Sequence, residues 1–341
     1  MVTYADVARA AQTSTAVVSY VLNNGPRPVS EKTRARVLAA ADSLGYRPNR
    51  LAAALRTGTT GFVGVLVPDS SIPYFAELTR VAVAELGRRG LLALVGHAGI
   101  SGVSEAGTID ALLSARVDGL IITAFWREEH ATLDLDVPVV YVHHKPASSA
   151  ATLVSSDNTH ATLLAVEHLR SHGEEPDFWT GPDDEGPLGE RLDAWRAGAA
   201  VGARLFRSAF NPAGAEAVFR QLVAAGRAPR SLVVATDQQA IGILSGAYEL
   251  GLRVPEDLTL ISLDGSPETE FTAPPLTVVQ QPLPEMIERA ITVLQTGDGN
   301  DEQALGRLVS RRSCGCVYRE TGEAPRGGVD AAHSPDGSAT D

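Results

Sequence analysis

Two pairs of side chains in this sequence have the chemistry to bind a metal ion. His168 and His172 are four residues apart in an expected helix, the spacing at which two zinc ligands share one helix face. Cys314 and Cys316 are the only cysteines, and a disulfide across the single residue between them would be strained. No glutamate follows the first histidine, and a zinc site at the cysteines needs two more ligands from elsewhere. We therefore expect a packed or solvated histidine pair, two reduced thiols, and no metal or other cofactor.

The common catalytic motifs of α/β enzymes are missing from the sequence. The only lysines, Lys32 and Lys145, follow Glu31 and His144, whereas a P-loop requires a glycine before its lysine. No G-x-G-x-x-G follows the apolar run at 62–67, and no G-x-S-x-G occurs. The sequence thus offers neither a nucleotide fingerprint nor a hydrolase nucleophile, and we expect no enzymatic activity.

Charge divides the chain into a small basic part and a large acidic part. The whole sequence carries a net charge of -12, yet its first sixty residues hold eight basic against three acidic side chains. A basic segment of this kind is compatible with a nucleic-acid partner. The sequence has neither an apolar run of membrane-spanning length nor a basic stretch leading into an apolar one at its N-terminus. We therefore expect a cytoplasmic protein that does not bind a membrane.

The basic segment has the pattern of three short helices. Thr3 is placed to cap the first helix, Ser14 the second and Ser30 the third, which should stop at Gly45. Apolar residues recur at helical spacing in the first and third helices: Val7, Ala8 and Ala11, then Val37, Leu38, Ala41 and Leu44. Two short helices joined by a tight turn, with a third packed across them, predict a helix-turn-helix head.

The second of these helices has two chemically different faces. One face is apolar, with Val17, Val18, Val21 and Leu22. The other is small or polar and has no acid, with Thr15, Ala16, Ser19, Tyr20 and Asn23. A surface without carboxylates can approach phosphates and base edges, although an ordinary amphipathic helix would show the same pattern. The helix alone leaves both interpretations open.

A short helical pattern and then an α/β pattern follow the head. Asn49 can cap a two-turn helix to about residue 56, which would be marginal without a partner. Beyond Gly61, apolar runs typical of parallel strands buried on both faces alternate with helical patterns. The runs occupy 62–67, 91–96, 119–124, 138–142, 231–236 and 258–263, and the helical patterns 74–89, 102–115, 158–172, 212–226 and 238–250. About 260 residues exceed one such sheet, so we expect two doubly wound lobes with a ligand cleft between them.

These motifs, taken in order, resemble the lactose repressor (LacI/GalR) family of bacterial transcription regulators. The head carries TYADVARAA, STAVVSYVLN, VSEKTRARVLAAADSLGYRPN and RLAAALRTG. The body carries IPYFAEL, RVDGLII, SDN, AVEHL, RLDAW, ATDQQAIG, ELGLRVPEDLTLISLD and PPLTVVQQP. Each motif is weak alone, but their fixed order over some three hundred residues makes the resemblance specific.

The resemblance implies a domain organisation. Residues 1–48 would form the helix-turn-helix domain and 49–60 the hinge helix and linker. Residues 61–320 would form a periplasmic-binding-protein-like domain for effector binding and dimerisation. Its N-lobe would span about 61–157 with 282–307, and its C-lobe about 158–281 with 308–320. The tail at 321–341, rich in small and polar residues, is expected to be disordered.

The resemblance also implies that a homodimer binds a near-palindromic, double-stranded operator. Thr15, Ala16 and Tyr20 would face bases in the major groove. Residues near phosphates would be Tyr4, Ser14, Ser19, Asn23, Ser30 and Thr33. In the hinge, Asn49 and Ala52 would accompany Leu55, the residue that wedges into the minor groove. Many family members have Thr-Val-Ser-Arg where this chain has Val17 to Tyr20, so a phenol replaces an arginine that could contact guanine.

In the body, the resemblance implies a small effector, a sugar or sugar derivative. The residues implied are Tyr74 and Phe75 on the first lobe, with His143, Arg191, Phe210, Asp237, Asp264 and Gln281. Arginine and aspartate can pair with vicinal hydroxyls, and aromatic faces can cover the apolar side of a sugar ring. His143 stands where several sugar-responsive members have an aspartate. The aromatic residues could instead be core residues, and Arg191 could simply pair with Asp264 across the lobes.

Two other classes of protein share parts of this pattern. A sugar-binding receptor without a role at DNA would share the body, and an α/β enzyme would share the alternating strands and helices. The basic head and the lack of an export signal count against the receptor, and the missing catalytic motifs count against the enzyme. The sequence is therefore interpreted as a DNA-binding transcription regulator, acting as a repressor under effector control.

Overall fold

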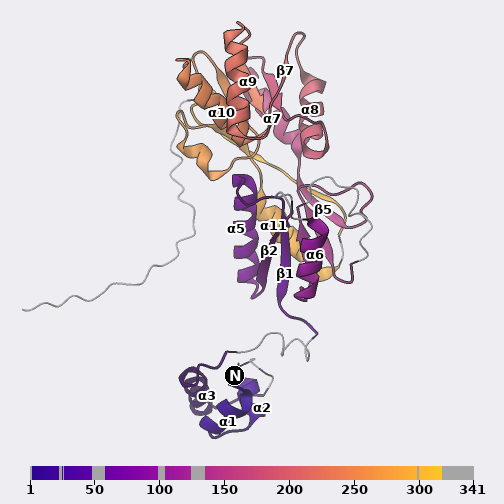
Figure 1. The fold of residues 1–341 in the computed structure, drawn as a ribbon, viewed down its shortest axis with the longest axis vertical. Coiled ribbons are helices and arrows are strands. Elements are labelled where there is room, and N and C mark those ends of the chain that lie inside the picture. The colour runs from indigo at the N-terminus through magenta and orange to yellow at the C-terminus, as the bar shows by residue number, and fades with distance from the viewer. Residues whose placement is uncertain are drawn as a thin grey trace, which may run out of the picture. The chain divides into compact units, whose positions relative to one another are not determined.

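The structure of the protein is a computed structural model (Figure 1). The residues that it describes are 2–22, 25, 27–47, 58–98, 104–123, 135–297 and 299–316. The expected hinge helix at 49–56 and the expected disordered tail at 321–341 lie outside these residues.

The head consists of three helices with the expected caps. They are α1 (Tyr4–Ala10), α2 (Thr15–Leu22) and α3 (Glu31–Ser43). At the start of α1, Thr3 and Asp6 form a reciprocal capping box, which satisfies backbone donors that a helix leaves free at its N-terminus. Ser30 caps α3, and the chain leaves that helix through Gly45, whose φ of 62° lies in the left-handed region that favours glycine.

The three head helices meet in a small apolar core. Its buried members are Val7, Ala8, Ala11, Val18, Val21, Val37, Ala40 and Ala41. Of the apolar residues that recur along α3, Val37 and Ala41 are buried in this core, whereas Leu38 and Leu44 are 47% and 37% exposed. Ala40, which was not among the recurring residues, joins them on the inward face, where small residues let the three short helices approach closely.

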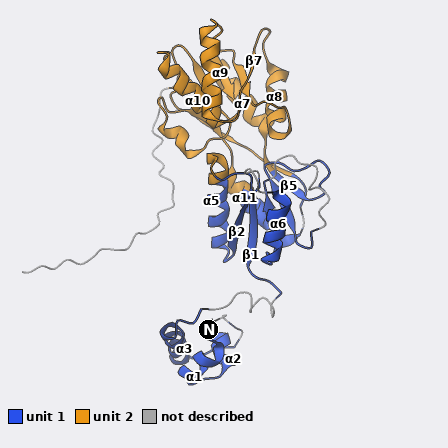
Figure 2. Cartoon of the chain, in the orientation of Figure 1, with its two compact units in different colours: residues 1–70, 78–154, 287–301 blue, residues 71–77, 155–286, 302–341 orange. Residues whose placement is uncertain are grey.

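The chain divides into two compact units (Figure 2). Unit 1 contains residues 1–70, 78–154 and 287–301, and unit 2 contains 71–77, 155–286 and 302–341. Each unit is assembled from segments far apart in the sequence, so the chain passes between the units more than once.

The first sheet has six strands in the order β11-β5-β4-β3-β1-β2. Its strands are β1 (Phe62–Val67), β2 (Leu92–His97), β3 (Leu120–Ile122), β4 (Val139–Val142), β5 (Thr152–Ser156) and β11 (Glu302–Ala304). The accompanying helices are α5 (Pro73–Arg88), α6 (Glu105–Ser114) and α11 (Leu283–Thr296). Strand β1 pairs in parallel with β2 and β3 and is almost wholly buried. Strand β2 was expected to be buried on both faces, but it is an edge strand with Leu92 49% and Val95 42% exposed.

The second sheet has six strands in the order β12-β10-β9-β8-β6-β7. Its strands are β6 (Asp177–Thr180), β7 (Leu205–Arg207), β8 (Ser231–Val234), β9 (Thr259–Ser262), β10 (Thr277–Gln280) and β12 (Arg307–Val309). The helices are α7 (Asn158–Ser171), α8 (Gly186–Gly198), α9 (Pro212–Ala224) and α10 (Asp237–Glu249), with a 3-10 turn, η2 (Pro267–Phe271). All neighbouring strands run parallel except β12, which is antiparallel to β10.

Unit 2 has a separate apolar layer on each face of its sheet. Successive residues of β6 point to opposite faces, so Phe178 packs with α7 and α8 while Trp179 packs with α9 and α10. Leu232 and Val233 on β8 divide in the same way. The strands are therefore covered on both sides, as parallel sheets require.

The α/β fold class predicted for the body is confirmed, but the sequence revealed only part of it. Strands β5, β6, β7, β10, β11 and β12 and helices α8 and α11 were not among the predicted elements. Most of these strands have only three or four residues, too few for their periodicity to stand out. Among the residues that the structure describes, no helix combines the length and the apolarity that crossing a membrane requires.

Candidate functional site

Helix α2 presents a small, uncharged surface on the head. Val18 and Val21 are buried, and Val17 and Leu22 pack against the same core, as the sequence predicted. Ser14, Thr15 and Ala16 are exposed at the start of the helix. Ser19 and Tyr20 are half-buried, and the Tyr20 ring lies against Gly25, leaving no room there for a Cβ. The surface that α2 offers to a partner therefore consists of small residues, with the phenol at its C-terminal end.

The expected phosphate-contacting residues have structural partners within the head. Tyr4 packs against Tyr46 with ring centroids 5.5 Å apart. The Ser14 hydroxyl accepts the Val17 N–H at 3.3 Å. The Ser30 hydroxyl accepts the Thr33 N–H and donates to Thr33 Oγ1 at 2.9 Å. These caps fix the starts of α2 and α3. Four further predicted residues lie outside the described residues: Asn23, Asn49, Ala52 and Leu55.

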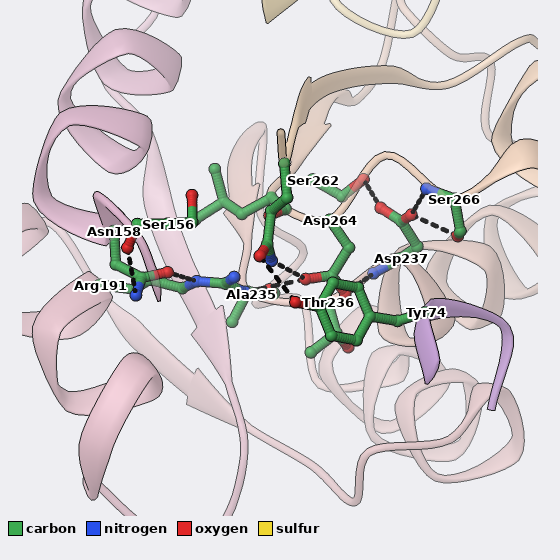
Figure 3. A network of polar contacts seen from close by, with 12 residues as sticks. Tyr74, Ser156, Asn158, Arg191, Ala235, Thr236, Asp237, Ser262, Asp264 and Ser266 are labelled. Carbon is green, nitrogen blue, oxygen red and sulfur yellow. Dashed lines mark hydrogen bonds and ion pairs between the residues drawn. The ribbon is translucent and has the colours of Figure 1, made fainter. Parts of the chain in front are cut away.

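Unit 2 contains a buried polar network, which we call the Arg191 cluster (Figure 3). It is defined by Tyr74, Asn158, Arg191, Asp237, Ser262, Asp264, Ser266 and Gln281. Arg191, on α8, is only 2% exposed. Its Nε donates to Asn158 Oδ1 at 2.8 Å, and its Nη1 donates to the Ala235 carbonyl and to Asp264 Oδ1. The guanidinium is therefore held in one orientation by groups from three elements.

Asp264 links the arginine to Gln281 and Tyr74. Its Oδ1 accepts from Arg191 Nη1 and from Gln281 Nε2, both at 3.1 Å. Gln281 in turn accepts the Tyr74 hydroxyl on Oε1 at 2.9 Å. Burial, and then the charge of Asp264, raise the pKa of Tyr74, so its phenol stays protonated and acts as a donor.

Asp237, at the start of α10, is buried and fully engaged by serines. Ser262 Oγ donates to its Oδ1 at 2.5 Å, and the Ser266 N–H and hydroxyl donate to its Oδ2. Burial, reinforced by the nearby charge of Asp264, raises the pKa of Asp237 to about 6. Since these bonds occupy its carboxylate, Asp237 orders the loop after β9 more directly than it could contact a ligand.

The other predicted effector residues are less closely joined to this cluster. Phe75 is buried and packs edge-on against Tyr74 with ring centroids 5.1 Å apart. Phe210 is 37% exposed and covers Gly181, leaving no space for a side chain there. His143 belongs to unit 1, and its φ of 77° is unusual for a residue with a Cβ. The structure therefore brings Tyr74, Arg191, Asp237, Asp264 and Gln281 together in one hydrogen-bonded network, with Phe75 packed against Tyr74.

Two sequence interpretations are corrected here. Tyr74 and Phe75 were placed on the first lobe, but residues 71–77 group with unit 2, where Tyr74 bonds to Gln281. Arg191 and Asp264 were considered as a pair across the lobes, but both belong to unit 2. For Tyr74 and Phe75 the reason is that the chain crosses between the units, whereas Arg191 and Asp264 already lay within the one predicted C-lobe at 158–281.

Sequence reasoning missed the residues that orient the cluster. Asn158 bonds Arg191 through Oδ1 and Glu190 through Nδ2, and Ser262 and Ser266 hold Asp237. The signal available was the SDN stretch at 156–158, which the sequence analysis used only as a family motif. In the structure Asp157 caps α7 through the His160 N–H, and Asn158 begins that helix.

A hollow of about 400 Å³ opens beside the cluster. Tyr74, Asp264, Ser266 and Gln281 are among its lining residues, and all of its lining belongs to unit 2. Within the described residues, Arg191 Nη2 is buried and has no hydrogen-bond partner. A rigid guanidinium beside a carboxylate and an amide can donate to and accept from neighbouring hydroxyl groups.

The head and the body together define a class of protein: a helix-turn-helix DNA-binding domain joined to an α/β body of the kind that binds small molecules. Residues 3–49 match the family described as bacterial regulatory proteins, lacI family, and residues 188–321 match the periplasmic binding protein-like domain. The ribose operon repressor of Escherichia coli (strain K12) is 30% identical over 311 residues, covering 86% of this chain and 92% of that protein. The chain belongs to the lacI family of bacterial regulatory proteins.

Two further comparisons agree with this assignment. The transcriptional regulator MalR of Streptomyces coelicolor (strain A3(2)) is 32% identical over 311 residues, covering 85% of this chain and 88% of that protein. A crystal structure of the Lac repressor dimer bound to operator and an anti-inducer matches with a TM-score of 0.78 and 26% identity. That match covers 92% of this chain and 99% of the repressor chain. These relatives are regulators of transcription rather than enzymes.

Proposed function

We propose that this protein is a cytoplasmic transcriptional repressor whose homodimer binds a near-palindromic operator, and that a small effector controls its affinity for DNA. The exposed start of α2 carries the DNA-binding half of this proposal. It presents Thr15 and Ala16 without a nearby acid, while the valines of the same helix anchor it in the head. The Arg34 guanidinium also donates to the Val21 carbonyl at 3.4 Å, which ties the end of α2 to α3. A rigidly held helix with a small, uncharged surface fits a major groove.

DNA binding is tested with a substitution that adds a negative charge to the exposed start of α2. Ala16→Asp places a carboxylate on the exposed start of α2, where it would repel phosphates, without entering the core. Ala39→Asp adds the same charge to an exposed position on α3 and is the matched control. Fluorescence anisotropy with the DNA upstream of the protein's own gene should show at least about a hundredfold weaker binding for Ala16→Asp, since lost contacts and repulsion add. Equal binding by both variants would refute the role of α2.

Tyr20 distinguishes base reading from backbone contact. If Tyr20 reads a base, Tyr20→Ala should weaken binding to the operator and leave binding to unrelated DNA nearly unchanged. As a phosphate contact it should weaken both kinds of binding equally. Anisotropy titrations with operator and with unrelated duplex of the same length measure the two affinities. Equal loss on both duplexes would contradict the base-reading assignment.

For the effector we propose a polyhydroxylated molecule, a sugar or sugar derivative, bound at the Arg191 cluster. The support is twofold: the buried Nη2 of Arg191 has no hydrogen-bond partner among the described residues, and the hollow beside the cluster is lined in part by Asp264, Ser266 and Gln281. Burying an unpaired guanidinium nitrogen is unfavourable, and a ligand oxygen would compensate it. We further propose that His143 and Phe210 contribute to this site, as the family resemblance implies.

A ligand screen tests the effector class. Thermal-shift measurements with sugars, sugar phosphates and nucleosides should show an increased melting temperature for one class, because a ligand that binds only the folded state stabilises it. Arg191→Lys should abolish that shift because lysine lacks the planar guanidinium with its paired N–H donors. Arg204→Lys, where a half-buried arginine pairs with Asp177 outside the Arg191 cluster, should retain it. A shift produced by nucleosides alone would overturn the carbohydrate assignment. The active compound should then change operator affinity in the anisotropy assay.

A further inference from the structure

Four side chains from two distant segments of unit 2 converge at one point. We call this group the His–Cys cluster; its members are His168, His172, Cys314 and Cys316. The ligand atoms that they offer all lie within 4.8 Å of one another. The sequence analysis had judged the two pairs separately, and each was incomplete as a metal site. The fold supplies to each pair the two ligands that it lacked.

Helix α7 positions the two histidines. His168 is in its last turn and His172 is its C-cap residue, so the two rings stand one above the other on the same side. Their centroids are 4.9 Å apart, and their Nε2 atoms are 3.3 Å apart. His168 is half-buried and His172 is exposed, so the helix presents both rings toward the surface end of unit 2.

The segment after β12 positions the two cysteines. Cys314 is buried and Cys316 is half-buried, with only Gly315 between them. Gly315 has a φ of 94°, and its N–H donates to the Arg312 carbonyl at 3.0 Å. This left-handed turn, which glycine adopts without strain, directs both thiols toward α7 although a single residue separates them.

The distances between the ligand atoms match those around a tetrahedral zinc ion. His168 Nε2 is 3.3 Å from Cys314 Sγ and 3.4 Å from Cys316 Sγ, and His172 Nε2 is 3.3 Å from Cys316 Sγ. Zinc bound tetrahedrally to two nitrogens and two sulfurs would separate neighbouring ligand atoms by about 3.3 to 3.8 Å. Four of the six distances between ligand atoms therefore match such a coordination shell, and the other two, from Cys314 Sγ to Cys316 Sγ and to His172 Nε2, are within 4.8 Å.

Hydrogen bonding alone accounts poorly for this arrangement. His168 Nε2 has three close neighbours: Cys314 Sγ, Cys316 Sγ and His172 Nε2. A ring nitrogen offers either one N–H or one lone pair in the plane of the ring, so it serves one partner well. A cation at the centre would instead receive one lone pair from each of the four atoms. We propose that the His–Cys cluster binds one zinc ion.

The donor types favour zinc over other common cations. Thiolate and imidazole ligands suit zinc, whereas magnesium, calcium and manganese prefer oxygen. Two thiolates would also neutralise the charge of a divalent ion. Thr277 Oγ1, on β10, donates to Cys314 Sγ at 3.1 Å, the kind of supporting bond that orients metal ligands. Four protein ligands leave no open coordination position, which is typical of a structural rather than a catalytic zinc site.

The proposed ion would join the end of the described chain to α7. Cys314 and His168 are separated by 146 positions, so the ion would close a long loop that contains most of unit 2 and residues 287–301 of unit 1. The same helix begins at Asn158, which bonds Arg191. Zinc at one end of α7 would therefore stabilise the helix that orients the Arg191 cluster at its other end. The proposal for zinc is independent of the proposed effector and of DNA binding.

The metal content of the full-length protein tests the proposal. Protein purified without a histidine tag should contain one zinc per chain by elemental mass spectrometry. His172→Asn and Cys316→Ser should lose that zinc, and since His172 is exposed, its variant should still fold. His160→Asn, another histidine of α7 that lies outside the cluster, is the matched control and should keep it. Full zinc content in His172→Asn and Cys316→Ser would refute the assignment of ligands.

Two further measurements separate a specific site from weak surface binding. Cobalt added to metal-free protein should give the visible spectrum of a tetrahedral thiolate site in wild type and in His160→Asn, but not in His172→Asn. A chelator should lower the melting temperature of wild type, leave that of His172→Asn unchanged, and expose two thiols to a disulfide reagent. Protein that neither carries zinc nor takes it up at micromolar concentration would overturn the proposal. A Cys314–Cys316 disulfide in freshly purified protein would overturn it equally.

Discussion

The two polar clusters of unit 2 are completed in different ways. In the Arg191 cluster the charge of the arginine faces that of Asp264, and Asn158, Gln281 and two serines supply further hydrogen bonds. In the His–Cys cluster four potential metal ligands lie close together, and His168 Nε2 has three neighbours although it can serve only one of them well. The first cluster is thus held largely by the protein itself, and the second is proposed to need an ion.

This difference has consequences for folding. Removing a member of a charged, buried network leaves its partner uncompensated, and the cost appears under all conditions. Removing a metal ligand costs stability only where the metal is present to be lost. A chelator should therefore leave the cost of a substitution in the Arg191 cluster unchanged and abolish the cost of one in the His–Cys cluster, although α7 contributes residues to both.

The largest expected effect is that of Arg191→Ala. The free energy of unfolding should decrease by about 3 to 5 kcal/mol, because Asp264 would remain buried without its cation. Urea denaturation measures this loss, and the same loss is expected with and without a chelator. Arg196→Ala removes an arginine that is 47% exposed and paired with Asp193, and it should cost no more than about 1 kcal/mol. A loss for Arg191→Ala as small as that for Arg196→Ala would contradict the role assigned to the network.

The next largest expected effect is a pH dependence of the unfolding free energy that comes from Asp237. Its pKa is raised from 3.8 to about 6 in the folded protein, so the folded state binds this proton more tightly than the unfolded state. The resulting stability is fully present below the ordinary pKa and is lost as the pH rises through about 6. Relative to Asp237→Asn, wild type should therefore lose up to about 3 kcal/mol of unfolding free energy between about pH 4 and pH 7.

The comparison with Asp237→Asn isolates the titration of Asp237 and of the neighbour whose charge acts on it, Asp264. Asparagine keeps the shape and one acceptor for the serines around it but does not titrate. Titrating groups that do not interact with Asp237 contribute equally to both proteins and cancel in the difference. Urea denaturation at a series of pH values gives the two curves. If the unfolding free energies of the two proteins ran parallel with pH, burial would not raise the pKa of Asp237 as its surroundings imply.

The long, regular elements could be predicted well from the sequence, whereas sites assembled from residues far apart in the sequence could not. The strand at 62–67 and the helices of the head stand out because their apolar spacing repeats over enough residues. Strands of three residues such as β7 and β12 carry no such signal. Leu38 belongs to the apolar spacing of α3 and yet is exposed, because periodicity identifies an apolar position but not whether a partner covers it.

The candidate sites show the same limit more sharply. Arg191, Asp237 and Asp264 were reached through resemblance to a family, and Asn158, which orients the arginine, was missed. The histidine pair and the cysteine pair were each judged incomplete as a metal site, and with 146 positions between His168 and Cys314 nothing in the sequence indicated that the two pairs meet. Only the sheet of unit 2, which carries α7 on one face and the segment after β12 beside it, brings these halves together.

The smallest expected effect is a change in zinc affinity on substitution of Thr277, which contacts a proposed zinc ligand but is not one itself. Thr277→Val keeps the buried shape but removes the hydroxyl that donates to Cys314 Sγ, and zinc affinity should decrease about tenfold to a hundredfold. Thr277→Ser retains a hydroxyl and should retain most of the affinity. Competition with a chromophoric chelator measures both constants. If the hydroxyl served packing alone, both variants would bind zinc as wild type does and would differ from it only in unfolding free energy. If Thr277→Val lost zinc affinity and Thr277→Ser kept it, the ion rather than the surrounding protein would be what completes this cluster.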